Sequence, residues 1–225
     1  MKKIRIITTL LFILSSSFLF SELVSALQEN NQVQPLDDKV KTFLDNMRNE
    51  WGDWNVPYSD GQILYDLILE NNYTHALEIG TSTGHSGIWI AWALSKTGGK
   101  LITIEINEDR YNEAINNFEQ AGLSSYIDAR LADAHQLVKA LDGPFDFVFC
   151  DADKGWYKNY FIDVYPKLEV GGCYTAHNVS LSVWGKVFGG GASEFYAYIK
   201  ELPGLETTIN NSGAGISISY KREEK

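Results

Sequence analysis

The sequence is poor in basic residues, and this limits the partners that the chain can bind. It has 19 lysines and arginines against 29 aspartates and glutamates, so its formal net charge at pH 7 is -10. Binding to DNA, RNA or an anionic membrane requires clusters of basic side chains that neutralise phosphates. The acidic balance therefore argues against nucleic acid and anionic membrane as partners, and it is typical of a surface that maintains solubility.

Cysteine is also scarce, and this excludes a structural zinc site. The two cysteines, Cys150 and Cys173, lack the paired spacing of zinc ligands. One follows a strand-like run and the other lies near the start of a later run, which places them at opposite ends of parallel neighbours. A disulfide needs Cα atoms less than about 7 Å apart. We therefore expect two buried free thiols, with a disulfide as the alternative.

The N-terminus has the three-part pattern of a secretory signal. Three basic residues in the first five positions precede an apolar run over residues 6–20, and small residues stand three and one before Leu27. The run is shorter than the ~20 residues of a membrane span. We therefore expect residues 1–26 to be a cleaved signal peptide, followed by a polar linker over residues 27–35, and the protein to be secreted or periplasmic. The alternative is a membrane anchor through residues 4–20.

The remaining residues, 36–225, suit one domain of ordinary size. Apolar positions recur at helical spacing from Leu36 to Trp51, and Ser59 or Asp60 is then expected to cap a second helix after Pro57. Strand-like and helical runs alternate from there on, which predicts a doubly wound α/β fold with a mainly parallel, seven-stranded, Rossmann-like sheet and a C-terminal antiparallel hairpin. The predicted strands are His75–Ile79, Leu101–Ile106, Tyr126–Leu131, Phe145–Cys150, Gly172–Ala176, Leu205–Asn210 and Gly215–Tyr220, and the predicted later helices cover residues 86–96, 108–121, 133–141, 155–167 and 193–201.

The first predicted strand runs into a glycine-rich loop, E-I-G-T-S-T-G-H-S over residues 78–86. Such a loop lets a ligand approach the backbone and the N-terminal amides of the next helix. Gly80, Gly84 and Gly87 miss the G-x-G-x-x-G spacing of a dinucleotide site, which argues against a nicotinamide-dependent oxidoreductase. Glu78 suits a cationic group better than a pyrophosphate. The alternative is a tight turn whose glycines serve only packing.

The next two strands end in residues that suit an adenosine group. Glu105 ends the second strand, about 20 residues beyond the glycine-rich turn, where an acid commonly binds ribose hydroxyls. Asp133 and Ala134 follow the third strand, where an adenine ring would lie. The alternatives are a solvated carboxylate for Glu105 and a helix N-cap for Asp133.

The fourth and fifth strands end in polar residues that suit catalysis. The apolar run F-D-F-V-F-C precedes Asp151, Asp153 and Lys154, at the edge where α/β sheets hold their chemistry. Asp151 is a candidate ligand for a hard metal ion and Lys154 a candidate general base, with surface ion pairs as the alternative. After the fifth strand, Asn178 offers a carbonyl oxygen to a metal. His177 beside it is a candidate metal ligand, base or structural hydrogen-bonding residue.

Together these stretches resemble the caffeoyl-CoA and catechol O-methyltransferase family of class I methyltransferases. The resemblance runs from Trp54 to Tyr220 and rests on W-N-V-P-Y-S-D-G-Q, A-L-E-I-G-T-S-T-G-H-S, F-D-F-V-F-C-D-A-D-K-G-W-Y-K-N-Y and V-G-G-C-Y-T-A-H-N-V. It implies the methyltransferase form of the doubly wound sheet. It also implies methyl transfer from S-adenosylmethionine to a hydroxyl of a small, phenolic or catechol-like acceptor, and it suggests a homodimer.

The resemblance assigns roles to individual residues. A divalent metal held by Asp151, His177 and Asn178 would lower the pKa of a bound acceptor hydroxyl. Lys154, catalytic together with Asp151, would then remove the proton as general base. Trp184 would form an aromatic wall of the acceptor site. The residues that would contact the cofactor are Val56, Gly61, Glu78, Gly80, Thr81, Ser86, Glu105, Asp133, Ala134 and Asp153.

Two departures from the family pattern bear on this assignment. His177 stands where the family has an aspartate, and imidazole suits zinc or manganese better than magnesium. The metal is therefore expected to differ, to bind weakly or to be absent, and in the last case His177 itself would take the proton. The spacing from Asn178 to Trp184 is longer than usual, so the acceptor pocket is reshaped. The missing aspartate leaves a second function open, that of an exported, catalytically degenerate cofactor-binding protein.

Overall fold

The computed structural model describes residues 36–52, 55–181 and 190–223. The chain divides into two compact units, one up to Thr42 and one from Phe43 onwards, and the second contains the whole sheet. The predicted signal peptide and linker lie outside the described residues. Within the described part, no helix is both long and apolar enough to cross a membrane.

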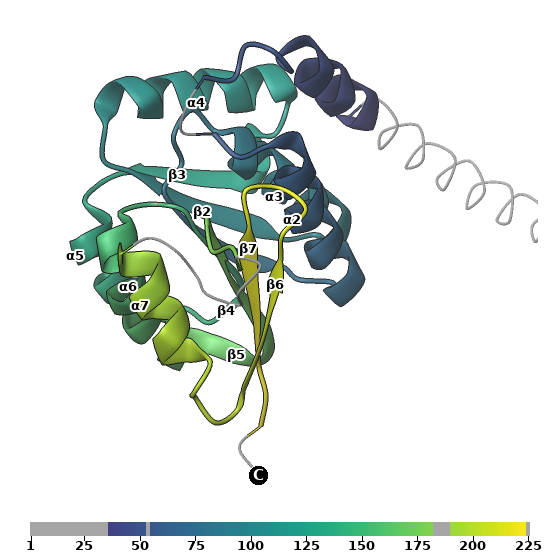
Figure 1. The fold of residues 1–225 in the computed structure, drawn as a ribbon. Coiled ribbons are helices and arrows are strands. Elements are labelled where there is room, and N and C mark those ends of the chain that lie inside the picture. Colours follow the sequence, from purple (N-terminus) through teal and green to yellow (C-terminus); the bar gives the residue numbers. More distant parts are fainter. Residues whose placement is uncertain (1–35, 53–54, 182–189, 224–225) are drawn as a thin grey trace, which may run out of the picture. The chain divides into compact units, whose positions relative to one another are not determined.

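A seven-stranded sheet forms the centre of the second unit (Figure 1). Its strand order is β3-β2-β1-β4-β5-β7-β6, with β1 to β5 parallel and β7 antiparallel to both of its neighbours. The predicted fold class is therefore confirmed, including the C-terminal hairpin. The strands are β1 (His75–Ile79), β2 (Lys100–Glu105), β3 (Ile127–Leu131), β4 (Phe145–Cys150), β5 (Leu168–His177), β6 (Leu205–Asn210) and β7 (Ile216–Lys221).

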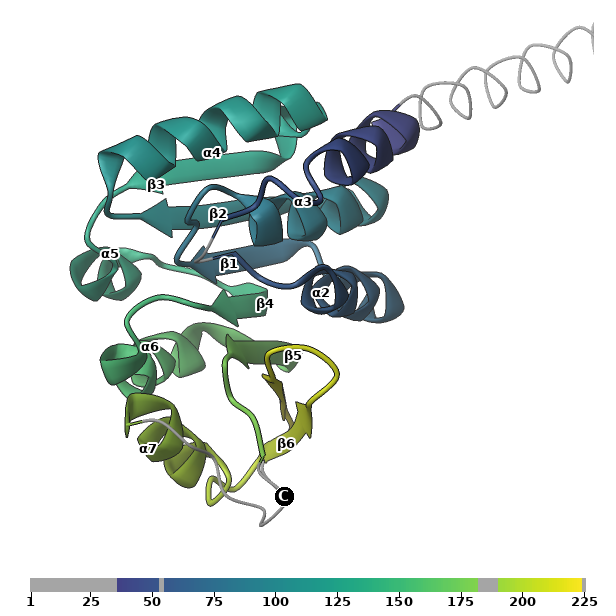
Figure 2. The same cartoon turned by 45° about the horizontal axis from the view of Figure 1, so that its top comes forward.

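Helices cover both faces of the sheet, as Figure 2 shows. One core lies under α2 and α3 and takes Ala76, Phe147 and Phe149 from the strands. The other lies under α5, α6 and α7 and takes Leu77 and Val148. Neighbouring strand residues thus point to opposite cores, as the two-residue period of a strand requires. The helices are α2 (Tyr58–Asn71), α3 (His85–Thr97), α4 (Glu108–Ala121), α5 (Ala134–Ala140), α6 (Tyr157–Val164) and α7 (Gly190–Ile199).

Both cysteines are buried and free, as expected. Cys173 pairs in register with Phe147, three positions along β4 from Cys150. Burial raises the pKa of each thiol to about 12. Because the thiolate is the reactive form of cysteine, neither residue is a nucleophile at neutral pH.

The start of α2 differs from the prediction, and the difference matters for the site. Pro57 occupies the N-cap position and Tyr58 begins the helix, so neither Ser59 nor Asp60 caps it. Proline is well tolerated at a helix start, because its missing N–H would have no intrahelical partner there. The Asp60 side chain, buried in the first turn, is thereby available for a long-range contact.

Other elements also differ from their predicted bounds. The helix expected to reach Trp51 ends at residue 46, and β5 begins at Leu168 instead of Gly172. The helix expected over residues 155–167 is instead a 3-10 turn, the helix α6 and a second 3-10 turn. Pro166 in that last turn has no N–H to continue the α-helical ladder, which explains the break.

The carboxyl ends of the parallel strands meet at one edge of the sheet. Ile79 of β1 pairs with Ile104 of β2 and with Cys150 of β4, and Cys150 pairs with Ala176 of β5. The residues that follow these positions in each strand therefore lie side by side, and the motifs after β1, β2, β4 and β5 meet at this edge.

Candidate active site

The glycine-rich loop after β1 passes very close to the loop after β4. Gly80 has a φ of 100°, and a Cβ placed on it would lie 2.7 Å from the carbonyl oxygen of Asp151. A side chain at this position would be strained by its backbone conformation and would also clash with the neighbouring backbone. Glycine is therefore required here for the two loops to approach each other.

A cavity of about 360 Å³ opens beside these loops. Six of the predicted site residues line it: Gly80, Glu105, Asp133, Ala134, Asp151 and Asp153. The structure thus brings together residues from four strand ends that are far apart in the sequence. The lining residues that the sequence prediction did not include are Ser82, Ile104, Ile106, Arg110, Ala132, His135, Ala152 and Tyr160.

Glu105 is held in place at this cavity by two backbone amides. Its Oε2 accepts a hydrogen bond from the N–H of Ser82 at 2.8 Å, and its Oε1 accepts one from Asn107 at 2.9 Å. Each carboxylate oxygen keeps a second lone pair that can accept a hydrogen bond from a ligand hydroxyl. Asp133 lines the same cavity while its Oδ1 caps α5 through the N–H of His135. The two interpretations of Asp133, ligand contact and helix cap, are thus compatible.

Glu78 lies fully buried behind the glycine-rich loop. Its Oε2 accepts a hydrogen bond from the hydroxyl of Thr103, whereas its Oε1 has no partner among the described residues. Burial raises the pKa of this carboxyl to about 8, although hydrogen bonds from Ser86 and Thr103 oppose the shift. A buried acceptor without a partner is costly, so this oxygen is suited to a cationic donor from a ligand.

Five of the predicted cofactor contacts do not line the cavity: Glu78, described above, and four others. Gly61 of α2 faces α3, where a Cβ would lie 2.3 Å from the indole of Trp89. Thr81 hydrogen-bonds to Thr103, and Ser86 acts to lower the pKa of Glu78. The fourth, Val56, is buried and is described with His85 below. A direct contact of these four residues with a cofactor stays a prediction.

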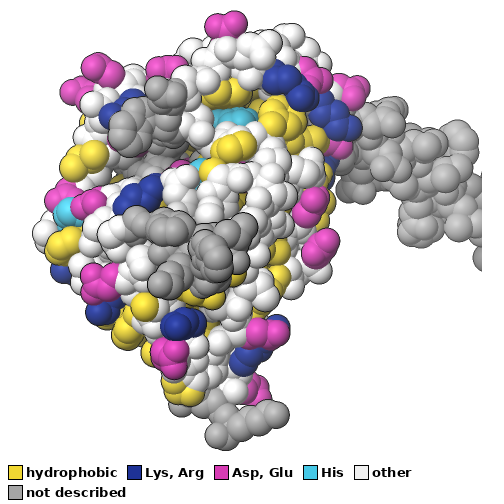
Figure 3. All heavy atoms as spheres, viewed as in Figure 1, with side chains coloured by type: hydrophobic (Ala, Val, Ile, Leu, Met, Phe, Trp, Pro, Cys, Tyr) yellow, Lys and Arg dark blue, Asp and Glu magenta, His cyan; other side chains and the backbone are white. Residues whose placement is uncertain are grey.

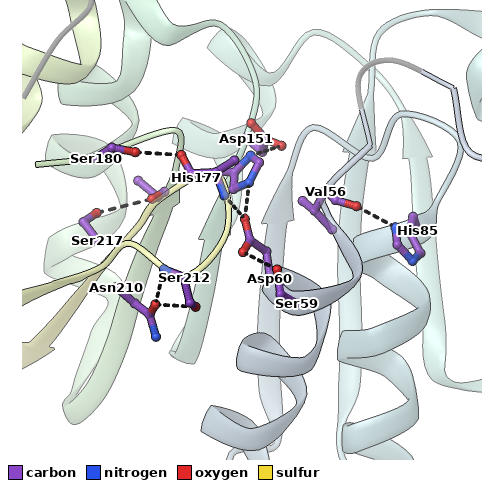
Figure 4. A network of polar contacts seen from close by, with 12 residues as sticks. Val56, Ser59, Asp60, His85, Asp151, His177, Ser180, Asn210, Ser212 and Ser217 are labelled. Atoms are coloured by element: carbon purple, nitrogen blue, oxygen red, sulfur yellow. Dashed lines mark hydrogen bonds and ion pairs between the residues drawn. The ribbon is translucent and has the colours of Figure 1, made fainter. Parts of the chain in front are cut away.

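His85, at the start of α3, was not predicted as a site residue. Its Nδ1 lies 2.9 Å from the carbonyl oxygen of Val56 (Figure 4). Its Nε2 accepts a hydrogen bond from the indole N–H of Trp89. The ring therefore carries its proton on Nδ1. Burial lowers the pKa of His85 to about 4, so this ring stays neutral at physiological pH. Trp51 stacks on it with the ring centroids 4.5 Å apart.

Lys154 and Asp151 form a close ion pair after β4. The Lys154 Nζ donates to Asp151 Oδ1 at 2.6 Å and to the Tyr157 hydroxyl at 3.0 Å. Tyr157 in turn donates to the backbone carbonyl oxygen of His177. The lysine side chain is 40% exposed, whereas that of Asp151 is 14% exposed. The ammonium group is thus fixed in direction and still has access to solvent.

His177 lies between two carboxylates, as Figure 4 shows. Its Nε2 is 2.9 Å from Asp60 Oδ2, and its Nδ1 is 3.0 Å from Asp151 Oδ2. The first contact is a hydrogen bond, and the second is an ion pair with less favourable alignment. Burial acts to lower the pKa of His177, but Asp151 and Asp60 outweigh it and raise the pKa to about 9.

Asp60 is the site residue that sequence analysis missed most clearly. It has no exposed surface, and it accepts hydrogen bonds from the N–H of Ala214 and the hydroxyl of Ser59. Burial acts to raise its pKa, but the hydrogen bond from His177 and that from Ala214 lower it below the usual value. Asp60 was interpreted as a helix cap, and nothing in the local sequence distinguishes that role from the observed one.

These contacts do not fit the predicted divalent metal site. Both oxygens of Asp151 already contact cations, and both ring nitrogens of His177 contact carboxylates. The backbone after His177 turns at Asn178, which has a φ of 55° and lies exposed. Within the described residues, no group of three or more His, Cys, Asp or Glu side chains is arranged to hold a metal ion. The predicted acceptor contact, Trp184, lies outside the described residues.

The strand order and the cavity at the strand ends together define a methyltransferase fold. The face shown in Figure 3 has basic and acidic side chains interspersed over its surface. An O-methyltransferase from Bacillus cereus, solved in complex with SAH, is similar with a TM-score of 0.69 and 25% identity, covering 82% of this chain and 91% of that one.

Sequence comparison identifies the family within this class. A profile of the O-methyltransferase family matches residues 30–196, more than half of the chain, and the chain therefore belongs to this family. A catechol O-methyltransferase from Niastella koreensis is 40% identical over 111 residues, which are 48% of this chain and 50% of that protein. Caffeoyl-CoA O-methyltransferase 1 from Eucalyptus globulus is 32% identical over 130 residues, covering 56% and 52%. The chain thus spans about half the length of the curated relatives that it matches.

Proposed function

We propose that this chain transfers a methyl group from S-adenosylmethionine to a hydroxyl of a small phenolic or catechol-like molecule. The observation that carries the proposal is the buried Oε1 of Glu78, which lacks a partner among the described residues behind the glycine-rich loop. The protonated amino group of S-adenosylmethionine would supply that partner. Family membership and the names of the two curated relatives support the acceptor class.

Other residues at the cavity fit the rest of this cofactor. Glu105 is oriented by two amides and can accept hydrogen bonds from the ribose hydroxyls. The Ser82 hydroxyl is buried, has no hydrogen-bond partner among the described residues and lines the same cavity, so it can donate to a ligand carboxylate. Ala134, which has a small side chain, and Ile106 leave room on the apolar side for the adenine ring.

The proposed chemistry requires one proton transfer by the protein. When bound, S-adenosylmethionine supplies an electrophilic methyl group on its sulfonium sulfur. Lys154, after giving up a proton to solvent, accepts the proton of the acceptor hydroxyl on its Nζ. Asp151 and Tyr157 hold the Nζ in place, and such fixed geometry can supply much of the rate of a bimolecular reaction.

A catalytically inactive cofactor-binding protein is the second candidate, favoured by the histidine at position 177. Calorimetric titration of the full chain with S-adenosylhomocysteine tests what both candidates share. Saturable binding at one ligand per chain is expected, and the absence of any binding would refute both. A radiolabelled methyl-transfer assay with catechol and other phenols then separates them, because only the enzyme gives labelled product.

We further propose that residues 1–26 direct export of the protein. Their basic start, apolar run and small residues before Leu27 support this. N-terminal sequencing of protein recovered from the producing organism should begin at Leu27. Recovery of chains that begin at Met1 would instead support the membrane anchor.

A further inference from the structure

Four charged side chains form a continuous series of contacts at the edge of the sheet where the carboxyl ends of the parallel strands meet. Asp60 from α2, His177 from β5, Asp151 after β4 and Lys154 follow one another, with contacts of 2.9, 3.0 and 2.6 Å. The two carboxylates and the two cations alternate in this order, so the four side chains together carry no net charge. Figure 4 shows the first three of these residues converging from separate elements.

At one end of this series of side chains, Asp60 is held in place by contacts from distant parts of the sequence. Oδ2 of Asp60 accepts hydrogen bonds from the N–H of Ala214 and from His177, 117 residues away in the sequence. The turn between β6 and β7 is shaped around this carboxylate, since a Cβ on Gly213 would overlap its Oδ1. Three parts of the fold, α2, β5 and the last hairpin, are thus joined at one fully buried carboxylate.

The geometry also determines the charge of His177. Nε2 is hydrogen-bonded to the Asp60 carboxylate, which can only accept, so Nε2 carries a proton; Nδ1 makes no aligned hydrogen bond, but it lies at ion-pair distance from the Asp151 carboxylate, which favours a positively charged ring. Both nitrogens of His177 face carboxylates, at 2.9 Å for Asp60 and 3.0 Å for Asp151. The ring is therefore an imidazolium, and it has no free lone pair for a metal ion.

We propose that the His177 imidazolium is the resident cation of this active site, that Asp60 is the positioning residue that holds it there, and that methyl transfer by this chain requires no divalent metal. The proposal rests on the proposed function. The positive charge of His177 lies on the side of Asp151 opposite to Lys154. It therefore opposes the attraction of Asp151 for the Lys154 ammonium, and it fixes the carboxylate that directs the Nζ.

The first test measures metal binding without any methyl acceptor. The full chain and a His177→Asp variant are titrated with Mn²⁺, and free Mn²⁺ is followed by electron paramagnetic resonance, with and without S-adenosylhomocysteine. We expect the parent to show no saturable binding. The variant places an additional carboxylate beside Asp151 and Asn178, oxygen ligands that suit Mn²⁺, and it is expected to bind one ion. Saturable binding of one Mn²⁺ per parent chain would overturn the proposal, whether or not the variant folds.

The second test examines the positioning role of Asp60 by spectroscopy. With ¹⁵N-labelled histidine, the four histidines of the chain give few signals, and His177→Asn assigns the one of interest. At pH 7.5 the parent should show both nitrogens of His177 protonated, whereas Asp60→Asn should show a neutral ring. Glu194→Gln is the matched control, because it removes an exposed carboxylate paired with Lys158. A neutral His177 ring in the parent would refute the proposal even if Asp60→Asn does not fold.

Mn²⁺ binding and the protonation of His177 can both be measured whether or not the proposed function is correct. The proposed function is refuted by a different result, the absence of S-adenosylhomocysteine binding. Where catechol is methylated, parent activity should be unchanged by a chelator. Asp60→Asn should lower kcat at least tenfold while the affinity for S-adenosylhomocysteine stays within twofold of the parent. Activity that is lost with the chelator and restored by Mn²⁺ would contradict the proposal.

Discussion

The buried Glu78 carboxyl predicts that cofactor affinity depends steeply on pH. Its pKa of about 8 in the free protein means that about a tenth of the molecules are ionised at pH 7 and about a hundredth at pH 6. The ligand ammonium pairs only with the ionised carboxylate. Each pH unit below 8 should therefore weaken binding of S-adenosylhomocysteine about tenfold, or by ~1.4 kcal/mol.

Isothermal titration calorimetry measures this directly. At pH 7 binding should release about 0.9 proton per site, as follows from a pKa of about 8, and the released fraction is obtained from buffers with different heats of ionisation. Glu78→Gln keeps the shape of the side chain and removes the titration. Any slope that survives in this variant does not come from Glu78. A flat affinity from pH 6 to 8 in the parent, or an unchanged slope in Glu78→Gln, would refute this reasoning.

The same carboxyl makes a prediction for the free protein. Its folded pKa is raised above the value of 4.5 that applies when exposed, so its contribution to stability is fully present below pH 4.5 and is lost as the pH rises through 8. Glu78→Gln should remove this loss. Urea unfolding at pH 5 and pH 8.5 should therefore show a smaller difference in the free energy of unfolding for the variant than for the parent. An equal difference in both proteins would show that Glu78 is not the buried group responsible.

Two further substitutions test the base and the packing behind the site. Lys154→Ala should reduce kcat for a phenolic acceptor by about 10²- to 10⁴-fold while leaving the affinity for S-adenosylhomocysteine unchanged, and equal activity in variant and parent would exclude Lys154 as the base. Gly61→Ala should destabilise the fold by about 1–3 kcal/mol in urea unfolding, because its Cβ would lie 2.3 Å from the Trp89 indole. The exposed neighbour is the control, and Gln62→Ala should change stability by less than about 0.5 kcal/mol. A more stable Gly61→Ala protein, as helix propensity alone predicts, would show that the two helices separate to accept the methyl group.

The sheet and its catalytic edge were accessible from the sequence because their signals are local. The six residues of β4 are all buried, and the largely apolar character of this strand, interrupted only by Asp146, marked it as central. The polar residues after each strand could then be placed together, since parallel strands end at one edge. This reasoning predicted that Asp151 and His177 lie close together, and they do. It also gave residues that line the cavity from β1, β2, β3 and β4.

The features that the sequence did not reveal depend on contacts between distant segments. Trp89 and Gly61 lie close together because α2 packs on α3, and the sequence of neither helix alone predicts this contact. His135 and Tyr160 line the cavity because α5 and α6 lie on the same face of the sheet. Strand periodicity fixes which face a residue points to, but not which helix covers it. Sequence analysis therefore identified the acidic residues that line the cavity, but it missed the role of Asp60 and several other residues of the cavity wall.

His177 shows why a residue cannot be assigned a role from its strand position alone. Its place at the end of β5 was compatible with a metal ligand, a base or a structural residue, and the difference lies in what its two nitrogens face. Nε2 faces the carboxylate of Asp60, which lies in the first turn of α2. The strand pattern that located the other site residues gives no information about this helix. A buried charge without a partner costs several kcal/mol, so the buried Asp60 carboxylate and the buried His177 ring depend on each other. Exchanging an aspartate for a histidine at position 177 is therefore compatible with a folded site only where a second carboxylate, such as Asp60, already lies within reach.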